Sequence, residues 1–319
     1  MLAIRVVCFR FMGSAVAVLP GVNVAESLLS ALPLRSALPL PAGQTEETLR
    51  SLFESIELEG APKQECETYW REDWPRFVHT LGLVHALAGS CLELGSNPYF
   101  TSTLLRFFTN LELSFANYFG PHFPDNSSQN LKVRNPHTGR VEHCAMAFSH
   151  FNIEDAAFPF PAASFDVVLF CEVLEHLQSD PVKVLLEIKR VLRPEGHLIL
   201  TTPNVNRLEN VARMMAGANI YDPYSGYGPY GRHNREYNKH ELALLLQYCG
   251  FDVDVLFSAD VHDNISARLF SLDDIVPLVK FREYDLGQYL FVRSRNSRAA
   301  RRKRPAFLYR SYPPGELEL

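Results

Sequence analysis

Residues 90–99 combine a carboxylate, a glycine and a small polar turn in a pattern that suits a nucleotide-like ligand. An apolar strand carries Glu93 and ends before Gly95, and the apolar run 104–108 that follows the turn predicts a helix. In open α/β sheets, a strand, a tight turn and a helix bring the backbone close to such a ligand. The pattern predicts that the turn lies against one.

Glu112 is a second carboxylate, placed at the end of the next expected strand, in Leu111-Glu112-Leu113-Ser114. An acid at this place can accept hydrogen bonds from both hydroxyls of a ribose that lies across the strand ends. We therefore expect Glu112 to bind a ribose. A solvated acid beside a loop is the alternative.

Two histidines are candidates for proton transfer. His176 lies at a turn after an expected strand, and His233 lies in a segment rich in glycine and tyrosine, 227–237. Histidine titrates near neutral pH and can act as a general base on an alcohol. The alternatives are a turn-capping histidine at 176 and a loop histidine bonded to backbone at 233.

Alternating strands and helices must position these residues. The near-continuous apolar strands predict a largely parallel sheet with helices on both faces. Helices are expected at 180–192 and 238–249, and a leading helical region at 44–88. The seven expected strands are Ser90–Leu94, Asn110–Ser114, Cys144–Phe148, Phe165–Cys171, His197–Thr201, Phe251–Phe257 and Tyr289–Arg293.

Two further segments carry a resemblance to a known family. Residues 164–177 hold a strand with Phe-Asp-Val-Val followed by Glu-Val-Leu-Glu-His-Leu, and 191–204 hold Leu-Arg-Pro-Glu-Gly before another strand. Together they resemble the class I S-adenosylmethionine-dependent methyltransferases, within them the small-molecule branch that includes quinone-biosynthesis enzymes. The resemblance covers roughly 88–258 and the strand near 289–294. It implies an α/β, Rossmann-like fold with a seven-stranded, mostly parallel sheet between helices.

The resemblance also implies S-adenosylmethionine as the cofactor and places residues around it. Asn97 and Tyr99 replace two of the family's glycines, which puts the geometry of the turn in doubt. Carboxylates at strand ends suit a cationic sulfonium and a ribose better than a pyrophosphate. The implied cofactor residues are Glu93, Gly95, Ser96 and Asn97 at the amino-acid end, Glu112 and Leu113 at the ribose, Asn152 and Ile153 at the adenine, and Cys171 and Glu172 beneath the sulfonium.

In the resembled family, the segment after the fifth strand lies over the methyl acceptor. Here that segment contains His233 and four expected substrate-binding residues: Tyr230, Arg232, Arg235 and Tyr237. The two arginines could hold an anionic acceptor, or simply pair with Glu236 and Asp222. The expected function is methylation of an oxygen of a small molecule or sugar-like metabolite, with His233 and His176 as catalytic candidates.

Composition is ordinary for a globular protein, with 47% hydrophobic and 21% charged residues and a net charge of −5. No cysteine has zinc spacing, so no metal is expected, and the cysteines favour a reducing, cytoplasmic location. No apolar run is long enough for a membrane span. The basic run 293–304 leaves an RNA or protein methyltransferase as one alternative, although nucleic acid is not favoured. A cofactor-binding but inactive interaction module is another, and a homodimer is left open.

The expected organisation has four parts. They are a partly irregular N-terminal extension at 1–43, a helical cap at 44–88, a cofactor-binding domain at 89–295 and a basic C-terminal extension at 296–319.

Overall fold

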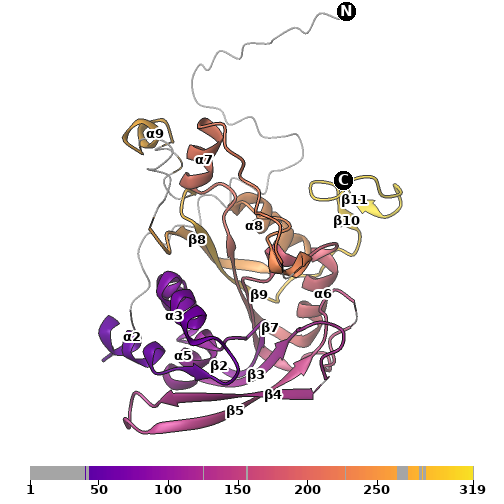
Figure 1. Cartoon of the computed structure of the whole chain (residues 1–319). Coiled ribbons are helices and arrows are strands. Elements are labelled where there is room, and N and C mark those ends of the chain that lie inside the picture. The colour runs from indigo at the N-terminus through magenta and orange to yellow at the C-terminus, as the bar shows by residue number, and fades with distance from the viewer. Residues whose placement is uncertain are drawn as a thin grey trace, which may run out of the picture. The chain divides into compact units, whose positions relative to one another are not determined.

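The computed structural model describes residues 40, 43–124, 126–155, 157–226, 228–263, 272–279, 282 and 285–318 (Figure 1). The expected extension at 1–43 lies almost wholly outside these residues. The described chain forms a nine-stranded sheet in the order β1-β4-β5-β3-β2-β6-β7-β9-β8. Its strands are β1 (Glu57–Leu58), β2 (Ala88–Leu94), β3 (Asn110–Asn117), β4 (Asn126–Arg134), β5 (Val141–His150), β6 (Phe165–Cys171), β7 (Leu192–Pro203), β8 (Asp252–Ala259) and β9 (Tyr289–Arg295).

The seven expected strands are all present, and the α/β Rossmann-like fold is confirmed. Strands β5, β3, β2, β6 and β7 run parallel, whereas β9 is antiparallel to both β7 and β8. Two strands were not expected, namely β4, which pairs antiparallel with β5, and the short β1 beside it. The sequence of β4 is mostly polar and buries little beyond Leu131 and Val133, so it carries no apolar strand signal.

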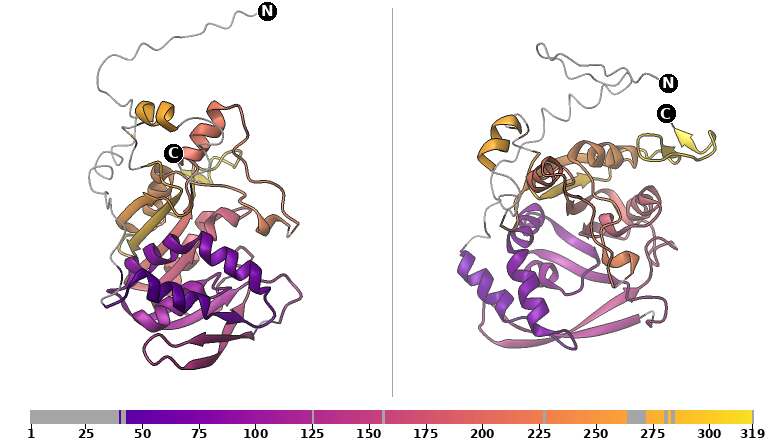
Figure 2. Two further views of the ribbon diagram at one scale, coloured as in Figure 1. Left: turned by 60° about the vertical axis from the view of Figure 1, so that its left-hand side comes forward. Right: turned by 45° about the horizontal axis from the view of Figure 1, so that its top comes forward.

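Four helices from the N-terminal half pack on one face of the sheet (Figure 2). Phe53 lies at the centre of an aromatic cluster there, with its ring 5.3 Å from those of Trp74, Phe77 and Phe100. This cluster joins the N-terminal helices to the sheet residues Leu169 and Phe291 in one core. The helices are α2 (Glu46–Glu54), α3 (Lys63–Glu72), α4 (Trp74–Val84) and α5 (Phe100–Phe108).

Helices α6 (Pro181–Val191) and α8 (Lys239–Tyr248) cover the opposite face, against β7 and β8 respectively. Each begins after a side-chain cap, because Asp180 accepts from Lys183 N at 3.2 Å and Asn238 accepts from Glu241 N at 3.0 Å. The remaining helical elements are α7 (Leu208–Met215), α9 (Leu272–Val279) and the single turns η1 (Leu174–His176) and η2 (Pro229–Gly231). Among the described helices, none is both long and apolar enough to span a bilayer.

The C-terminal residues fold back onto the start of α6. Asp180 accepts from Tyr309 Oη at 2.7 Å and from Arg304 at 2.9 Å. The short strands β10 (Arg304–Pro305) and β11 (Leu317–Glu318) pair parallel beside this contact. Four basic residues of 293–304 therefore form ion pairs within the fold: Arg295, Arg298, Arg301 and Arg304. Arg293 donates instead to the main-chain oxygen of Leu83 at 3.3 Å.

Parallel strands bring their carboxyl ends to one edge of the sheet. Leu94, Asn117 and Cys171 end β2, β3 and β6, which are neighbours in the sheet. Ligands of open α/β sheets bind at this edge. The fold therefore places the functional site above these three residues.

Candidate functional site

A cavity opens at the carboxyl edge of β2, β3 and β6. It gathers six of the expected site residues: Gly95, Asn152, Ile153, Glu172, His176 and Tyr230. The other lining residues are Leu94, Ala116, Asn117, Tyr118, Phe151, Val173 and Leu177. Segments far apart in the sequence thus meet where the topology predicts a ligand.

Gly95 allows the backbone to turn sharply at the cavity floor. Its φ is +74°, and a Cβ at this position would lie 2.8 Å from Val173 Cγ2. Its amide donates to Ala116 O at 2.8 Å, which continues the pairing of β2 with β3 for one more residue. A larger residue would be strained and would push into the wall of the cavity.

Asn117 fastens the turn that lacks two of the expected glycines. Its Oδ1 accepts from Ser96 Oγ at 3.2 Å and from Asn97 N at 3.0 Å, and its Nδ2 donates to Tyr99 Oη at 3.1 Å. Gln129 of β4 accepts from Asn97 Nδ2 and Tyr99 Oη as well, at 3.1 and 2.8 Å. Side-chain hydrogen bonds thus hold the turn in place, although two of the glycines expected there are missing.

The expected position of Glu112 at a strand end is wrong. Strand β3 continues to Asn117, so Glu112 lies near its start, exposed and outside the cavity, and Leu113 packs against the core. Ser114 resembles the end of a strand only because alternate residues of β3 face solvent. The residue that ends β3 in the cavity wall is Asn117, a carboxamide instead of the expected acid.

Glu93 lies in a smaller neighbouring cavity that shares Leu94 and Gly95 with the first one. The carboxylate is buried and accepts from Ser102 Oγ at 2.5 Å. Burial raises the pKa of Glu93 to about 7, against the opposing effect of this hydrogen bond. The smaller cavity also contains the expected residues Ser96, Asn97 and Cys171.

Arg76 of α4 reaches the same smaller cavity and was not expected from the sequence. It is 3% exposed and donates to Asp73 Oδ2 and Tyr69 Oη, both at 2.6 Å. Burial opposes its charge, but Tyr69, Glu172 and Asp73 raise the pKa of Arg76 well above its ordinary value. The sequence feature that could have indicated its role is a charged residue inside the apolar stretch 74–84.

Glu172 stands at the end of β6 with its side chain in the cavity wall. Its φ is +54°, and its Oε1 accepts from Thr201 Oγ1 at 2.7 Å. Burial, followed by the nearby charge of Glu175, raises the pKa of Glu172 to about 8. Burial and then Glu93 raise the pKa of the Cys171 thiol to about 12, so this sulfur is held protonated.

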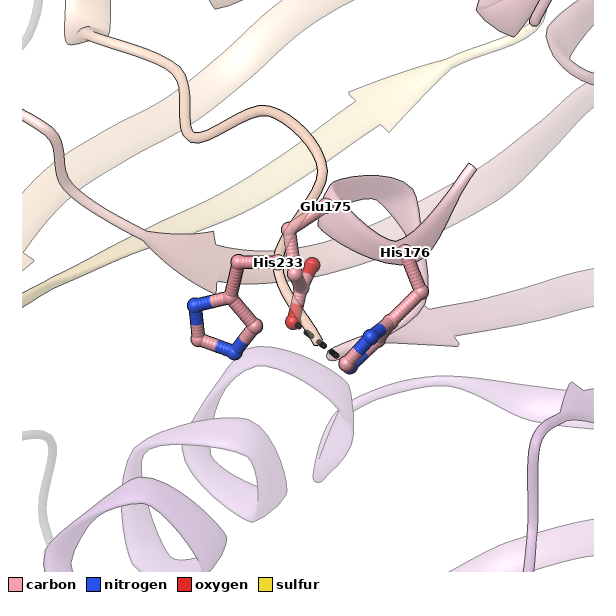
Figure 3. A group of neighbouring side chains, drawn as sticks. All are labelled: Glu175, His176 and His233. Carbon is pink, nitrogen blue, oxygen red and sulfur yellow. Dashed lines mark ion pairs between the residues drawn. The ribbon is translucent and has the colours of Figure 1, made fainter. Parts of the chain in front are cut away.

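Glu175, His176 and His233 meet beside the cavity (Figure 3). Their ligand atoms all lie within 4.8 Å of one another, and the two imidazole rings have centroids 5.1 Å apart. Burial lowers the pKa of His176. For His233, the hydrogen bond that its ring donates to Glu236 and the charge of Glu175 overcome burial and raise the pKa. The main chain holds the group together, because Glu175 O accepts from Asn234 N at 2.7 Å.

The expected substrate residues divide into two groups. Tyr230 lines the cavity, where its hydroxyl accepts from Asn152 Nδ2 at 2.8 Å, and Arg232 lies next to it over the ring of Tyr224. Arg235 instead forms an ion pair with Glu241. Within the described part of the chain, neither arginine pairs with Glu236 or Asp222, the alternative partners. Tyr237 is 1% exposed and belongs to the core, so its expected contact with substrate is not supported by its position.

A family model described as "Methyltransferase domain" matches residues 105–200, which include β3 to β6 and most of β7. A curated relative from Mycolicibacterium smegmatis, named a probable S-adenosylmethionine-dependent methyltransferase, is 34% identical over 115 residues, or 36% of this chain and 38% of the relative. A Mycobacterium tuberculosis protein with the same description is 36% identical over 107 residues, which is 34% of each chain. Residues 105–200 are thus similar to the S-adenosylmethionine-dependent methyltransferases. The quinone-biosynthesis branch is not confirmed.

The match is partial, since the chain spans little more than a third of the length of these curated relatives. Among solved structures, a methyltransferase complexed with the Trm112 activator of Haloferax volcanii has a TM-score of 0.45 at 17% identity, covering 74% of this chain and 93% of that one. A Thermotoga maritima S-adenosylmethionine-dependent methyltransferase has a TM-score of 0.44 at 15% identity, covering 73% and 95%.

The cavities fit S-adenosylmethionine, the cofactor of the methyltransferases that residues 105–200 match. The buried carboxylate of Glu93 suits its cationic amino group, and the space above Gly95, which a Cβ would fill, admits the ligand close to the backbone. Asn117 and Asn152 offer polar groups at the cavity wall, and Ile153 and Tyr118 offer apolar surface. No residue of the turn is a lysine that would point to a phosphate.

Proposed function

We propose that the protein transfers the methyl group of S-adenosylmethionine to an oxygen of a small molecule. One observation carries this proposal: a single cavity joins the glycine turn after β2 to His176 and Tyr230 on its far side. Cofactor and acceptor groups thereby share one space, as in-line displacement requires. The methyl group passes from sulfur to oxygen, the acceptor loses a proton, and neutral S-adenosylhomocysteine leaves.

In this proposal the cofactor lies across the ends of β2, β3 and β6. Its amino-acid end lies toward Glu93 and the turn of Gly95, Ser96 and Asn97. Its adenine lies near Asn152 and Ile153, and its sulfonium near Cys171 and Glu172. Asn117 takes the ribose position that the sequence assigned to Glu112, since it ends β3 at the cavity wall.

The acceptor is proposed to lie under Tyr230, next to the cluster of Glu175, His176 and His233. An alcohol acceptor must lose a proton during transfer, and histidine is the side chain suited to assist near neutral pH. His176 lines the cavity and His233 lies directly behind it. The two histidines are therefore the proposed acceptor-activating residues.

A small acceptor is favoured over RNA or protein because the basic tail is engaged within the fold. Arg295, Arg298, Arg301 and Arg304 pair with Asp254, Asp252, Glu318 and Asp180. Only Arg302 and Lys303 of the run 295–304 have no ion pair among the described residues. The hydrogen bonds from Asn117 to the turn likewise weaken the case for an inactive module, which rested on its missing glycines.

Calorimetric titration with S-adenosylhomocysteine tests the proposal. Wild type should bind with micromolar affinity, and Asn117→Ala should bind at least about tenfold more weakly, because it loses the hydrogen bonds that hold the turn. Glu112→Ala is the matched control on the same strand and should bind as wild type does. Absence of binding by folded wild type, or equal losses in both variants, would contradict the proposed site.

A further inference from the structure

Glu175 is a fully buried carboxylate, and one of its two oxygens accepts no hydrogen bond from the described residues. Its Oε2 accepts from Thr202 Oγ1 at 2.9 Å, whereas its Oε1 has no hydrogen-bond partner among the described residues. A carboxylate is costly to bury unless both oxygens are satisfied. The nearby charge of the half-buried Glu172 makes a charged Glu175 less favourable still. A positively charged partner next to Oε1 would therefore stabilise the buried carboxylate of Glu175.

The two imidazoles next to Glu175 each have Nδ1 engaged with another group. Nδ1 of His176 is 2.9 Å from Arg232 O, and Nδ1 of His233 is 3.0 Å from Glu236 Oε1. A carbonyl and a carboxylate both accept hydrogen bonds, so Nδ1 of each ring carries the N–H. Nε2 is then the nitrogen of each ring that has a free lone pair. Nε2 of His176 lies 3.8 Å from Glu175 Oε1.

These contacts match the environment of metal-binding histidines. Such histidines donate the N–H that faces away from the metal to a carbonyl or a carboxylate, which fixes the ring and its tautomer. Arg207 in turn holds Glu236, the partner of His233. Both rings are therefore oriented by groups outside the cluster, and Nε2 of His176 faces the oxygen of Glu175 that has no hydrogen bond.

We propose that Glu175, His176 and His233 bind one divalent transition-metal cation such as Zn²⁺. Two imidazole nitrogens and a carboxylate oxygen form a ligand set of catalytic zinc sites, in which a further position stays open. Tetrahedral ligands about 2.0–2.1 Å from zinc lie about 3.4 Å apart. The ligand atoms here lie within 4.8 Å of one another, so small side-chain movements would close the site. Nitrogen ligands disfavour Mg²⁺ and Ca²⁺.

The site would face the cavity, because His176 is both a proposed ligand and a lining residue. An acceptor oxygen could then occupy the open position, where the cation would ease loss of its proton to water. The two histidines would then activate the acceptor through the cation and not as free bases. This last step rests on the proposed function, but binding of the cation does not. The inference departs from the expectation of no metal, which rested on spacing along the sequence and could not bring residue 233 next to 176.

Binding of Co²⁺ and Zn²⁺ to the full-length, chelator-treated protein tests the proposal. One equivalent of Co²⁺ should give visible d–d absorption without the intense thiolate band that cysteine ligands produce, and Zn²⁺ should displace it. His176→Ala and His233→Ala should each abolish stoichiometric binding. Glu236→Gln changes the partner of His233 and no proposed ligand, and it should weaken binding about 10- to 100-fold.

His240→Ala is the control, since this exposed histidine lies outside the cluster, and it should bind as wild type does. Thermal melting of each variant verifies that it is folded. If folded wild type binds no equivalent, or if both ligand variants keep full binding, the proposal is wrong and a protonated His233 is the partner of Glu175. Calorimetry with S-adenosylhomocysteine is scored separately, so failure of the cofactor site and failure of the cation site remain distinguishable.

Discussion

Glu93→Gln should stabilise the protein at alkaline pH and at the same time weaken its binding of S-adenosylmethionine. Burial raises the pKa of Glu93 from 4.5 to about 7. The folded state therefore holds a proton that the unfolded state releases, so wild type loses stability as pH rises from about 4.5 to about 7 and keeps that deficit above it. Glutamine cannot ionise, and its amide oxygen can still accept from Ser102.

The expected size follows from this difference in pKa. Each unit corresponds to about 1.4 kcal/mol, so the variant should be more stable than wild type by about 3 kcal/mol at pH 8 and by about 1 kcal/mol at pH 5. For a chain of this length, about 3 kcal/mol corresponds to a rise in Tm of about 5 °C. The stability is gained because a charge needed only by the cationic ligand is no longer buried.

Thermal unfolding at the two pH values measures the effect, and calorimetry with S-adenosylmethionine measures the loss of binding. Glu112→Gln, an exposed acid on the neighbouring strand, is the control and should change neither quantity. A rise in Tm of equal size at pH 5 and pH 8 would refute the reasoning, because the gain would then not come from ionisation. If the variant binds S-adenosylmethionine as well as wild type does, Glu93 does not contact the cofactor.

Three further substitutions test other contacts. Arg76→Ala should lower the free energy of unfolding by about 3–5 kcal/mol, because it leaves Asp73, whose side chain is only 13% exposed, without its ion pair. A loss below about 1 kcal/mol in urea denaturation would contradict this. Tyr309→Phe removes the hydroxyl that donates to Asp180 and should cost about 1–2 kcal/mol, with faster proteolysis of the C-terminal residues than in wild type; equal rates would show that the hydroxyl does not hold them. Gly95→Ala sets a Cβ 2.8 Å from Val173 Cγ2 at a φ of +74°, so binding of S-adenosylhomocysteine should weaken about tenfold or more; unchanged calorimetry would mean that the turn is not at the cofactor.

The strands were predictable because their chemistry is local. Phe165–Cys171 matches β6 at both ends, since a continuous apolar run bounded by polar residues has few other solutions. The predicted length of β3 was too short because Glu112 and Ser114 face solvent. In the sequence, polar residues on the exposed side of a strand look the same as the end of the strand. β4 was missed because its pairing with β5, not its composition, makes it a strand.

The site was only partly predictable because its contacts join distant segments. The turn at Gly95 is encoded locally, and its place in the cavity follows from the order of the strands. By contrast, His233 reaches His176 only because Asn234 bonds to the backbone of Glu175 and His176. Arg76 enters the site through the packing of a helix on the sheet. No spacing along the chain encodes either of these encounters.

The position of β9 constrains the order in which the sheet can be assembled. In the described sheet, β8 has β9 as its only neighbour, although β9 comes later in the chain. β8 can therefore join the sheet only together with β9 or after it, and until then β7 presents an open edge with unpaired backbone groups. Closure of this edge is a long-range pairing, which is slow relative to local folding. The region 105–200 that carries the family match lacks β2 as well as β8 and β9, so by itself it would leave β3, β6 and β7 with unpaired edges. We therefore expect it to self-associate instead of folding alone.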